Sequence, residues 1–147
     1  MKYIISILAV ALICTTLMLT GKESPKDKGI GPIKDLKLGE IDKTLLPKGR
    51  SLFNEKCIVC HSLDSKKVGP PLRNVAKDQT PEFIMNLLVN TLEMQQKDEH
   101  IKQLISQYKV VMVDYKLSQD QARELLEYLR AAAEWKNFSS KSVNIYF

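Results

Sequence analysis

The sequence contains one short motif, Cys57-Ile58-Val59-Cys60-His61, that restricts the possible folds more than any other stretch. Two cysteines three positions apart, with a histidine directly after the second, are what covalent haem attachment requires. The two thiols add across the haem vinyl groups, and the imidazole reaches the iron from the proximal side. The motif therefore predicts one covalently bound haem, for which the rest of the chain must form the pocket.

Two other kinds of site also use closely spaced cysteines. A thioredoxin-like redox pair needs a βαβ surrounding, whereas the sequence on either side of Cys57 and Cys60 has helix and loop patterns. A structural zinc site needs four ligands, and the only other histidine, His100, stands alone in a charged helical stretch. The third cysteine, Cys14, lies in the leading apolar run and cannot complete such a site. Both alternatives are therefore disfavoured.

The N-terminus has the pattern of an export signal. A basic residue precedes an apolar run from Tyr3 to Leu19, and the chain turns polar near Gly21. The run is longer than a usual signal core but short for a membrane span, which takes about 20 residues. Cleavage near Gly21 and retention as a membrane anchor through residues 3–19 both remain open, while bulky Ile13 before Cys14 disfavours a lipoprotein. Each case predicts an exported, periplasmic domain.

The rest of the chain has the composition of one all-α domain. Its length suffices for a single core, and six glycines and one tryptophan disfavour a turn-rich β-sandwich or barrel. Residues 22–44 carry Lys, Gly and Pro without a helical period, which indicates a linker, although their apolar residues could lie along the domain. The predicted divisions are a signal or anchor over 1–21, this linker over 22–44, a helical domain over 45–136 and a C-terminal tail over 137–147.

Apolar spacing and capping residues predict helices separated by one long loop. The first helix runs into the cysteine motif, and residues 62–78 are predicted as loop because Gly69-Pro70-Pro71 interrupts them. The next helix has a buried stripe that is expected to continue to Leu92. In chain order, the helices are marked by Pro47, by Thr80-Pro81-Glu82, by the apolar spacing from Ile101 to Tyr108, and by a capping box at Ser118 and Gln121.

Beyond the motif, residues from about Lys48 to Arg130 resemble the class I cytochromes c, small exported bacterial proteins that carry a single haem. In that family a glycine and an aromatic residue upstream of the cysteines, here Gly49 and Phe53, lie where the C-terminal helix crosses closely. Tyr128 matches the aromatic residue of that helix. The resemblance implies an all-α cytochrome c fold, in which four to five helices wrap around one covalently bound haem c after the N-terminal segment.

The resemblance also implies the groups on the proximal side of the iron. Cys57 and Cys60 would hold the haem, and His61 would be the proximal axial ligand. Pro70 matches the family's loop proline, whose carbonyl oxygen accepts a hydrogen bond from the proximal imidazole. Such a bond orients the ring and strengthens it as a ligand.

The distal ligand is expected to be a methionine from the C-terminal half, because a His/Met pair raises the reduction potential. Met85 lies inside a predicted helix, where a core position suits it, so Met94 and Met112 are the candidates. Met112 has the family's position in an irregular segment before the last helix, although Val113 replaces the usual proline. Met94 follows His61 too closely to wrap across the haem easily, so Met112 is favoured.

Charge restricts the expected partners. The chain has a formal net charge of +5 at pH 7, and basic residues gather around the cysteine motif. They could steer an acidic redox protein or form an ordinary solvated surface. Binding of nucleic acid is disfavoured because the chain has neither a basic run nor an aromatic platform. The basic residues near the motif are Lys56, Lys66, Lys67, Arg73 and Lys77.

A haem with both axial positions filled by protein exchanges electrons at its edge, so the expected function is a one-electron carrier rather than an enzyme. The expected donor is a membrane quinol-oxidising complex, and the acceptor a terminal oxidase or reductase of a respiratory chain. Residues 93–109 are reminiscent of cytochromes that serve reductases, including those of denitrification. Two alternatives stay open: a peroxidase or gas binder with a labile sixth site, and a fixed subunit of a respiratory complex tethered through residues 3–19.

Overall fold

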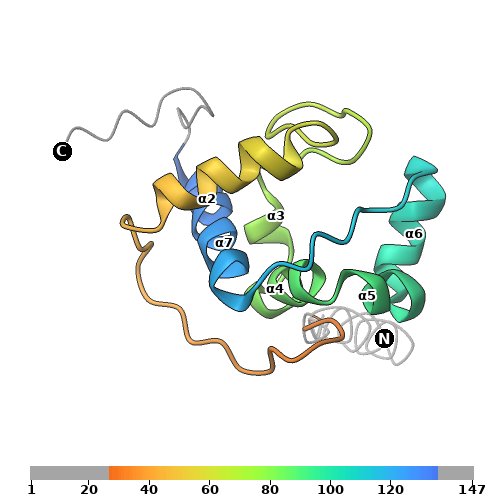
Figure 1. Ribbon diagram of the computed structural model, residues 1–147, viewed down its shortest axis with the longest axis horizontal. Coiled ribbons are helices and arrows are strands. Elements are labelled where there is room, and N and C mark those ends of the chain that lie inside the picture. The colour runs from red at the N-terminus through yellow and green to blue at the C-terminus, as the bar shows by residue number, and fades with distance from the viewer. Residues whose placement is uncertain (1–26, 136–147) are drawn as a thin grey trace, which may run out of the picture.

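The computed structural model describes residues 27–135, and every regular element in that range is helical (Figure 1). The predicted signal or anchor over 1–21 and the tail over 137–147 lie outside the described residues. No helix in the described part is long and apolar enough to cross a membrane. The helices are α2 (Leu46–Leu52), the π-helical turn η1 (Phe53–Cys57), α3 (Val75–Asp78), α4 (Pro81–Val89), α5 (Thr91–Lys97), α6 (Glu99–Tyr108) and α7 (Gln119–Glu134). The predicted all-α fold is confirmed.

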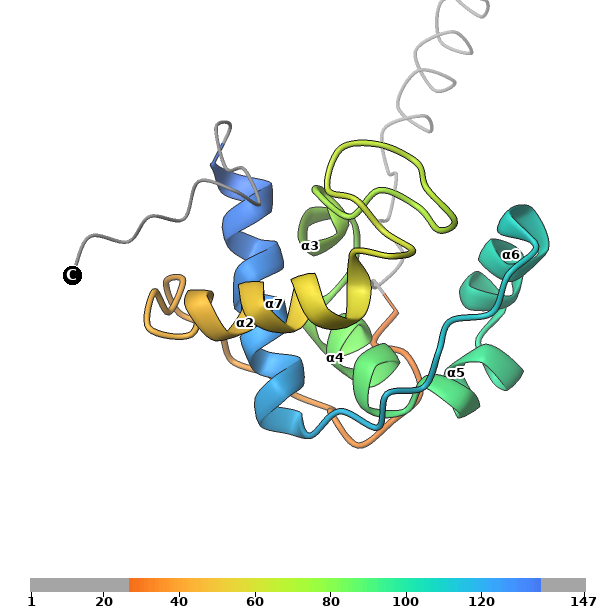
Figure 2. The same cartoon turned by 45° about the horizontal axis from the view of Figure 1, so that its top comes forward.

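Helices α2 and α7 cross closely, as the resemblance implied (Figure 2). Gly49 lies at the crossing, where a Cβ atom on it would be 2.0 Å from the backbone oxygen of Glu124. One turn further along, the rings of Phe53 and Tyr128 pack with their centroids 5.2 Å apart. Both rings are buried in the main core. Because Gly49 has no side chain, the two helices can approach this closely.

The predicted helix starts are present, but two segments differ from the sequence prediction. The Thr80 hydroxyl accepts a hydrogen bond from Phe83 N, and Ser118 and Gln121 form the reciprocal capping box that begins α7. The loop predicted over 62–78 contains the short helix α3 at its end. The stripe expected to continue to Leu92 stops earlier, because α4 ends at Val89 and Leu92 lies exposed on α5.

Residues 27–45, which include most of the segment predicted as a linker, lie along α4, α5 and α7 (orange in Figure 1). We call them the N-terminal strap. The completely buried side chain of Asn86 accepts a hydrogen bond from Ile33 N (2.9 Å) and donates to Lys28 O (2.9 Å) and Ile33 O (2.8 Å). Glu82 and Glu127 accept further bonds from strap N–H groups. Buried polar side chains therefore hold the strap to the helices.

Candidate haem-binding site

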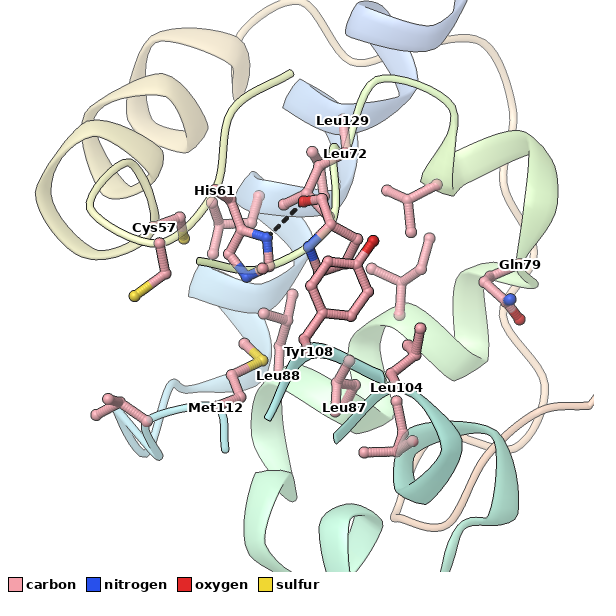
Figure 3. A pocket seen from close by; sticks show the side chains of 18 of the residues that line it. Cys57, His61, Leu72, Gln79, Leu87, Leu88, Leu104, Tyr108, Met112 and Leu129 are labelled. Atoms are coloured by element: carbon pink, nitrogen blue, oxygen red, sulfur yellow. Dashed lines mark hydrogen bonds between the residues drawn. The ribbon is translucent and has the colours of Figure 1, made fainter. Parts of the chain in front are cut away.

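A cavity of about 430 Å³ lies between the cysteine motif on one side and the segment that joins α6 to α7 on the other. Figure 3 shows His61 and Met112 on opposite sides of it, and Leu87, Leu88 and Leu129 are among the apolar side chains that line it. The predicted site residues that line the cavity are Cys57, Cys60, His61, Pro70 and Met112.

The cysteine motif follows directly from the widened turn η1. Ile58 N donates to Phe53 O (3.0 Å), and His61 N donates to Cys57 O (2.8 Å), so the motif curls back at the end of the helix. Both cysteines are unbridged and half-buried. Burial raises the pKa of the Cys57 thiol to about 11. A reactive thiolate needs a lowered pKa, so this thiol does not suit thioredoxin-like exchange.

The loop after the motif fixes the orientation of the His61 ring. Nδ1 lies 2.8 Å from the carbonyl oxygen of Pro70, and because a carbonyl only accepts, Nδ1 carries the proton and donates (Figure 3). Nε2 is then the unprotonated nitrogen, available to a metal. Gly69 packs under the ring, where a Cβ atom would lie 2.5 Å from His61 Cε1. Both residues of the predicted Gly69-Pro70 turn therefore contact the imidazole.

Arg73 ties this loop to the last helix. Its guanidinium forms a two-bond ion pair with Asp64 and also donates to the backbone oxygen of Ala132 on α7 (2.8 Å). The hydrogen bonds from Arg73 lower the pKa of the Asp64 carboxyl. Arg73 thus connects the loop after the cysteine motif to α7.

Met94, the other candidate ligand, does not line the cavity, and neither does Met85. Met94 is completely buried in a separate cluster with Phe83 and Ile101, and its sulfur accepts a hydrogen bond from Ile30 N of the strap (2.9 Å). Met85 is buried in the main core, as expected from its helix. Met112 is the methionine that lies opposite His61.

Comparison with known proteins identifies the fold. Residues 46–133 match the family described as cytochrome c. The chain belongs to the cytochrome c family. Among solved structures, it is similar to a cytochrome c from Rhodothermus marinus, with 47% identity, a TM-score of 0.68, and coverage of 71% of this chain and 90% of that one.

Two structures of an engineered form of the Rhodothermus marinus cytochrome c are similar to nearly the same extent. Both are 46% identical to this chain and cover 71% of it and 91% of their own length, with TM-scores of 0.68 and 0.65. The second of them is described as bound to a carbene intermediate. No curated protein sequence matches the chain.

Membership of the cytochrome c family implies one covalently attached haem c, and Cys57 and Cys60 fit its attachment motif. The cavity suits this group, because its walls are mainly apolar and both thiols lie at its edge. His61 offers Nε2 to an iron, while a porphyrin ring would lie against leucine side chains. The family also supports a role in electron transfer.

Sequence reasoning missed three contacts around the cavity. His100 was expected to stand alone, but it lines the cavity, and its Nε2 lies 3.2 Å from the Gln79 amide. The Lys56 Nζ lies 5.4 Å from the centroid of the Tyr115 ring, and the Lys66 Nζ lies 4.9 Å from that of Tyr108; both rings line the cavity. These partners are far apart in the sequence, so no local pattern could reveal them. The same holds for a fourth contact, between the Gln95 side chain and the backbone of Met112.

Proposed function

We propose that this cytochrome c is a one-electron carrier in which His61 and Met112 are the axial ligands of the haem iron. The observation that carries the proposal is that these two side chains lie on opposite sides of one apolar cavity, next to Cys57 and Cys60. The rival methionine supports it by exclusion, because the sulfur of Met94 accepts a hydrogen bond in a different cluster.

The side chains tune the site in three ways. The hydrogen bond to Pro70 holds the His61 ring in one orientation and makes it a better electron donor. A neutral thioether from Met112 favours the reduced state and raises the potential. The leucine-rich walls restrict the access of water, which limits the solvation of the more highly charged oxidised state. The bound haem supplies the one-electron redox change itself.

The cavity mouth is the proposed route for the electron. Val111 and Val113, which line the cavity, are exposed, with 64% and 55% of their surfaces accessible, and Val59 of the cysteine motif is 73% exposed. Lys56 and Lys66 lie over the rings of Tyr115 and Tyr108, two residues that also line the cavity. An apolar centre with basic neighbours suits brief contacts with acidic redox proteins. We expect a membrane quinol-oxidising complex as donor and a terminal oxidase or reductase, including one of denitrification, as acceptor.

The proposed location is the periplasm. It is supported by the apolar run of residues 3–19 and by the need to attach haem covalently after export. The same run would tether the domain to the membrane if it is retained. Fractionation tests this point: a carrier with a cleaved signal leaves the membrane without detergent, whereas an anchored one requires detergent.

The test of the function is a redox and ligand-binding comparison of the purified holoprotein with Met112→Ala. The wild type should titrate reversibly with one electron, show a methionine-to-iron charge-transfer band when oxidised, and take up cyanide slowly. Met112→Ala should lose the band, bind cyanide quickly and have a lower potential. Met94→Leu is the matched control and should keep the band. A wild type with high-spin iron that binds cyanide or carbon monoxide readily would instead favour a peroxidase or gas binder.

A further inference from the structure

The segment that would present the distal ligand has little support of its own. Residues 110–116 contain no helix, and within the described part of the chain their backbones form no hydrogen bond with another backbone group. The segment is bounded by two residues with positive φ, Lys109 at 57° and Lys116 at 48°. Alternate residues Val111, Val113 and Tyr115 are exposed and line the cavity. Some other group must therefore fix the backbone position of Met112.

The Gln95 side chain supplies this support. Its Oε1 accepts a hydrogen bond from Met112 N at 2.8 Å, and its Nε2 donates to Met112 O at 3.0 Å. One planar amide thus satisfies both backbone groups of the same residue, as a neighbouring β-strand would do. Both distances are those of good hydrogen bonds, so the pair restricts the translation and the rotation of the Met112 backbone.

Gln95 is itself held by a fixed helix. Its neighbour Met94 is completely buried and bonded to Ile30 of the N-terminal strap. The first residue of α5, Thr91, donates from its hydroxyl to Leu87 O in α4 (2.8 Å). The helix is thus attached both to the strap and to α4. Gln95 also lines the cavity, directly beside the segment that it holds.

We propose that Gln95 is a positioning residue that keeps the Met112 thioether at the iron. This inference rests on the proposed function, in which Met112 is the distal ligand. Without the two hydrogen bonds, the segment around Met112 would leave the iron more often. Loss of two hydrogen bonds of ordinary net strength corresponds to an open fraction about thirtyfold larger. The apparent affinity for an external ligand rises by the same factor, since only the open form binds it.

The experiment compares the oxidised holoproteins of wild type, Gln95→Leu, Gln95→Met and Gln96→Leu. Both Gln95 variants remove the hydrogen bonds with apolar side chains of similar size. Gln96 is an exposed neighbour on α5 and provides the matched control. The measurements are the dissociation constant for imidazole, read from the visible spectrum, and the pH at which the charge-transfer band disappears. Far-UV circular dichroism verifies that each variant is folded.

Both Gln95 variants should bind imidazole about thirtyfold more tightly than wild type and lose the band about 1.5 pH units lower, with Gln96→Leu unchanged. Agreement between the Leu and Met variants separates the lost hydrogen bonds from altered packing. Folded Gln95 variants with wild-type imidazole affinity and band stability would overturn the inference. If wild type itself lacks the band, the proposed function fails instead, so the two failures are distinguishable.

Discussion

Replacing Gly49 by alanine should weaken the crossing of α2 and α7 that frames the haem cavity. The added Cβ atom would lie 2.0 Å from Glu124 O, 2.7 Å from Glu124 C and 2.8 Å from Tyr128 Cβ. Cβ contacts in proteins are essentially never closer than 3.0 Å, so α2 must withdraw by about 1 Å. The nearest atoms belong to a backbone, which cannot rotate away as the end of a side chain can.

Two opposing effects determine how much Gly49→Ala lowers the free energy of unfolding. Overpacking of a close contact costs about 1–3 kcal/mol, and the backbone contact at Gly49 places this variant at the upper end. Alanine gains about 1 kcal/mol over glycine inside a helix. The net loss is therefore about 2 kcal/mol, which corresponds to a fall in Tm of about 8–16 °C for a domain of this size.

Unfolding of the holoprotein in guanidinium chloride, followed by far-UV circular dichroism, measures this loss. Gly39→Ala is the matched control, because a Cβ atom there would meet nothing within 4 Å. That variant should be neutral or stabilised by up to about 1 kcal/mol, since alanine restricts the unfolded chain. Equal unfolding midpoints for the Gly49 and Gly39 variants would refute the view that this crossing depends on glycine.

Three further results are expected. Gly69→Ala should push the His61 ring off its carbonyl partner, which raises the reduction potential because the imidazole becomes a weaker donor; an unchanged redox titration would contradict this. Asn86→Ala should lower the free energy of unfolding, measured with denaturant, by about 2–4 kcal/mol, because three hydrogen bonds are lost. The N-terminal strap should also become susceptible to protease. Asp64→Asn should cost less than about 1 kcal/mol at pH 7, because the carboxylate is mostly exposed. Since Arg73 lowers the pKa of Asp64, this contribution is present above the ordinary carboxyl pKa and disappears as the pH falls through the lowered value; a difference from wild type that persists in acid would be inconsistent.

The parts of the site that sequence reasoning could predict are those encoded by short-range patterns. The cysteine motif has a fixed spacing, and Gly69-Pro70-Pro71 predicts a loop, whereas the role of Pro70 beside His61 and the position of Met112 follow from the resemblance to the class I cytochromes c. The cap at Thr80 and the capping box at Ser118 depend on hydrogen bonds within one helical turn, so the sequence alone predicts where these helices begin. Such features need no knowledge of the tertiary structure.

The remaining features depend on residues that are distant in the sequence. The apolar character of Leu92 suggested a buried stripe, but the break at Asn90 turns that residue outward. The strap resembled a linker because its hydrogen-bond partners, such as Asn86, lie on another element. Gln95 has no distinctive neighbours in the sequence, and only the return of the chain past α5 brings it to Met112.

Axial coordination by Met112 is tested most directly by proton NMR of the reduced holoprotein with methyl-labelled methionine. A methyl group held against the iron lies over the porphyrin ring, whose ring current shifts its resonance far upfield. Assignment uses Met112→Ala and Met94→Leu. We predict one such resonance, absent from the Met112 variant and retained in the Met94 variant. A resonance that disappears with Met94, or a wild-type spectrum with no upfield methyl, would contradict the proposed His61 and Met112 ligation.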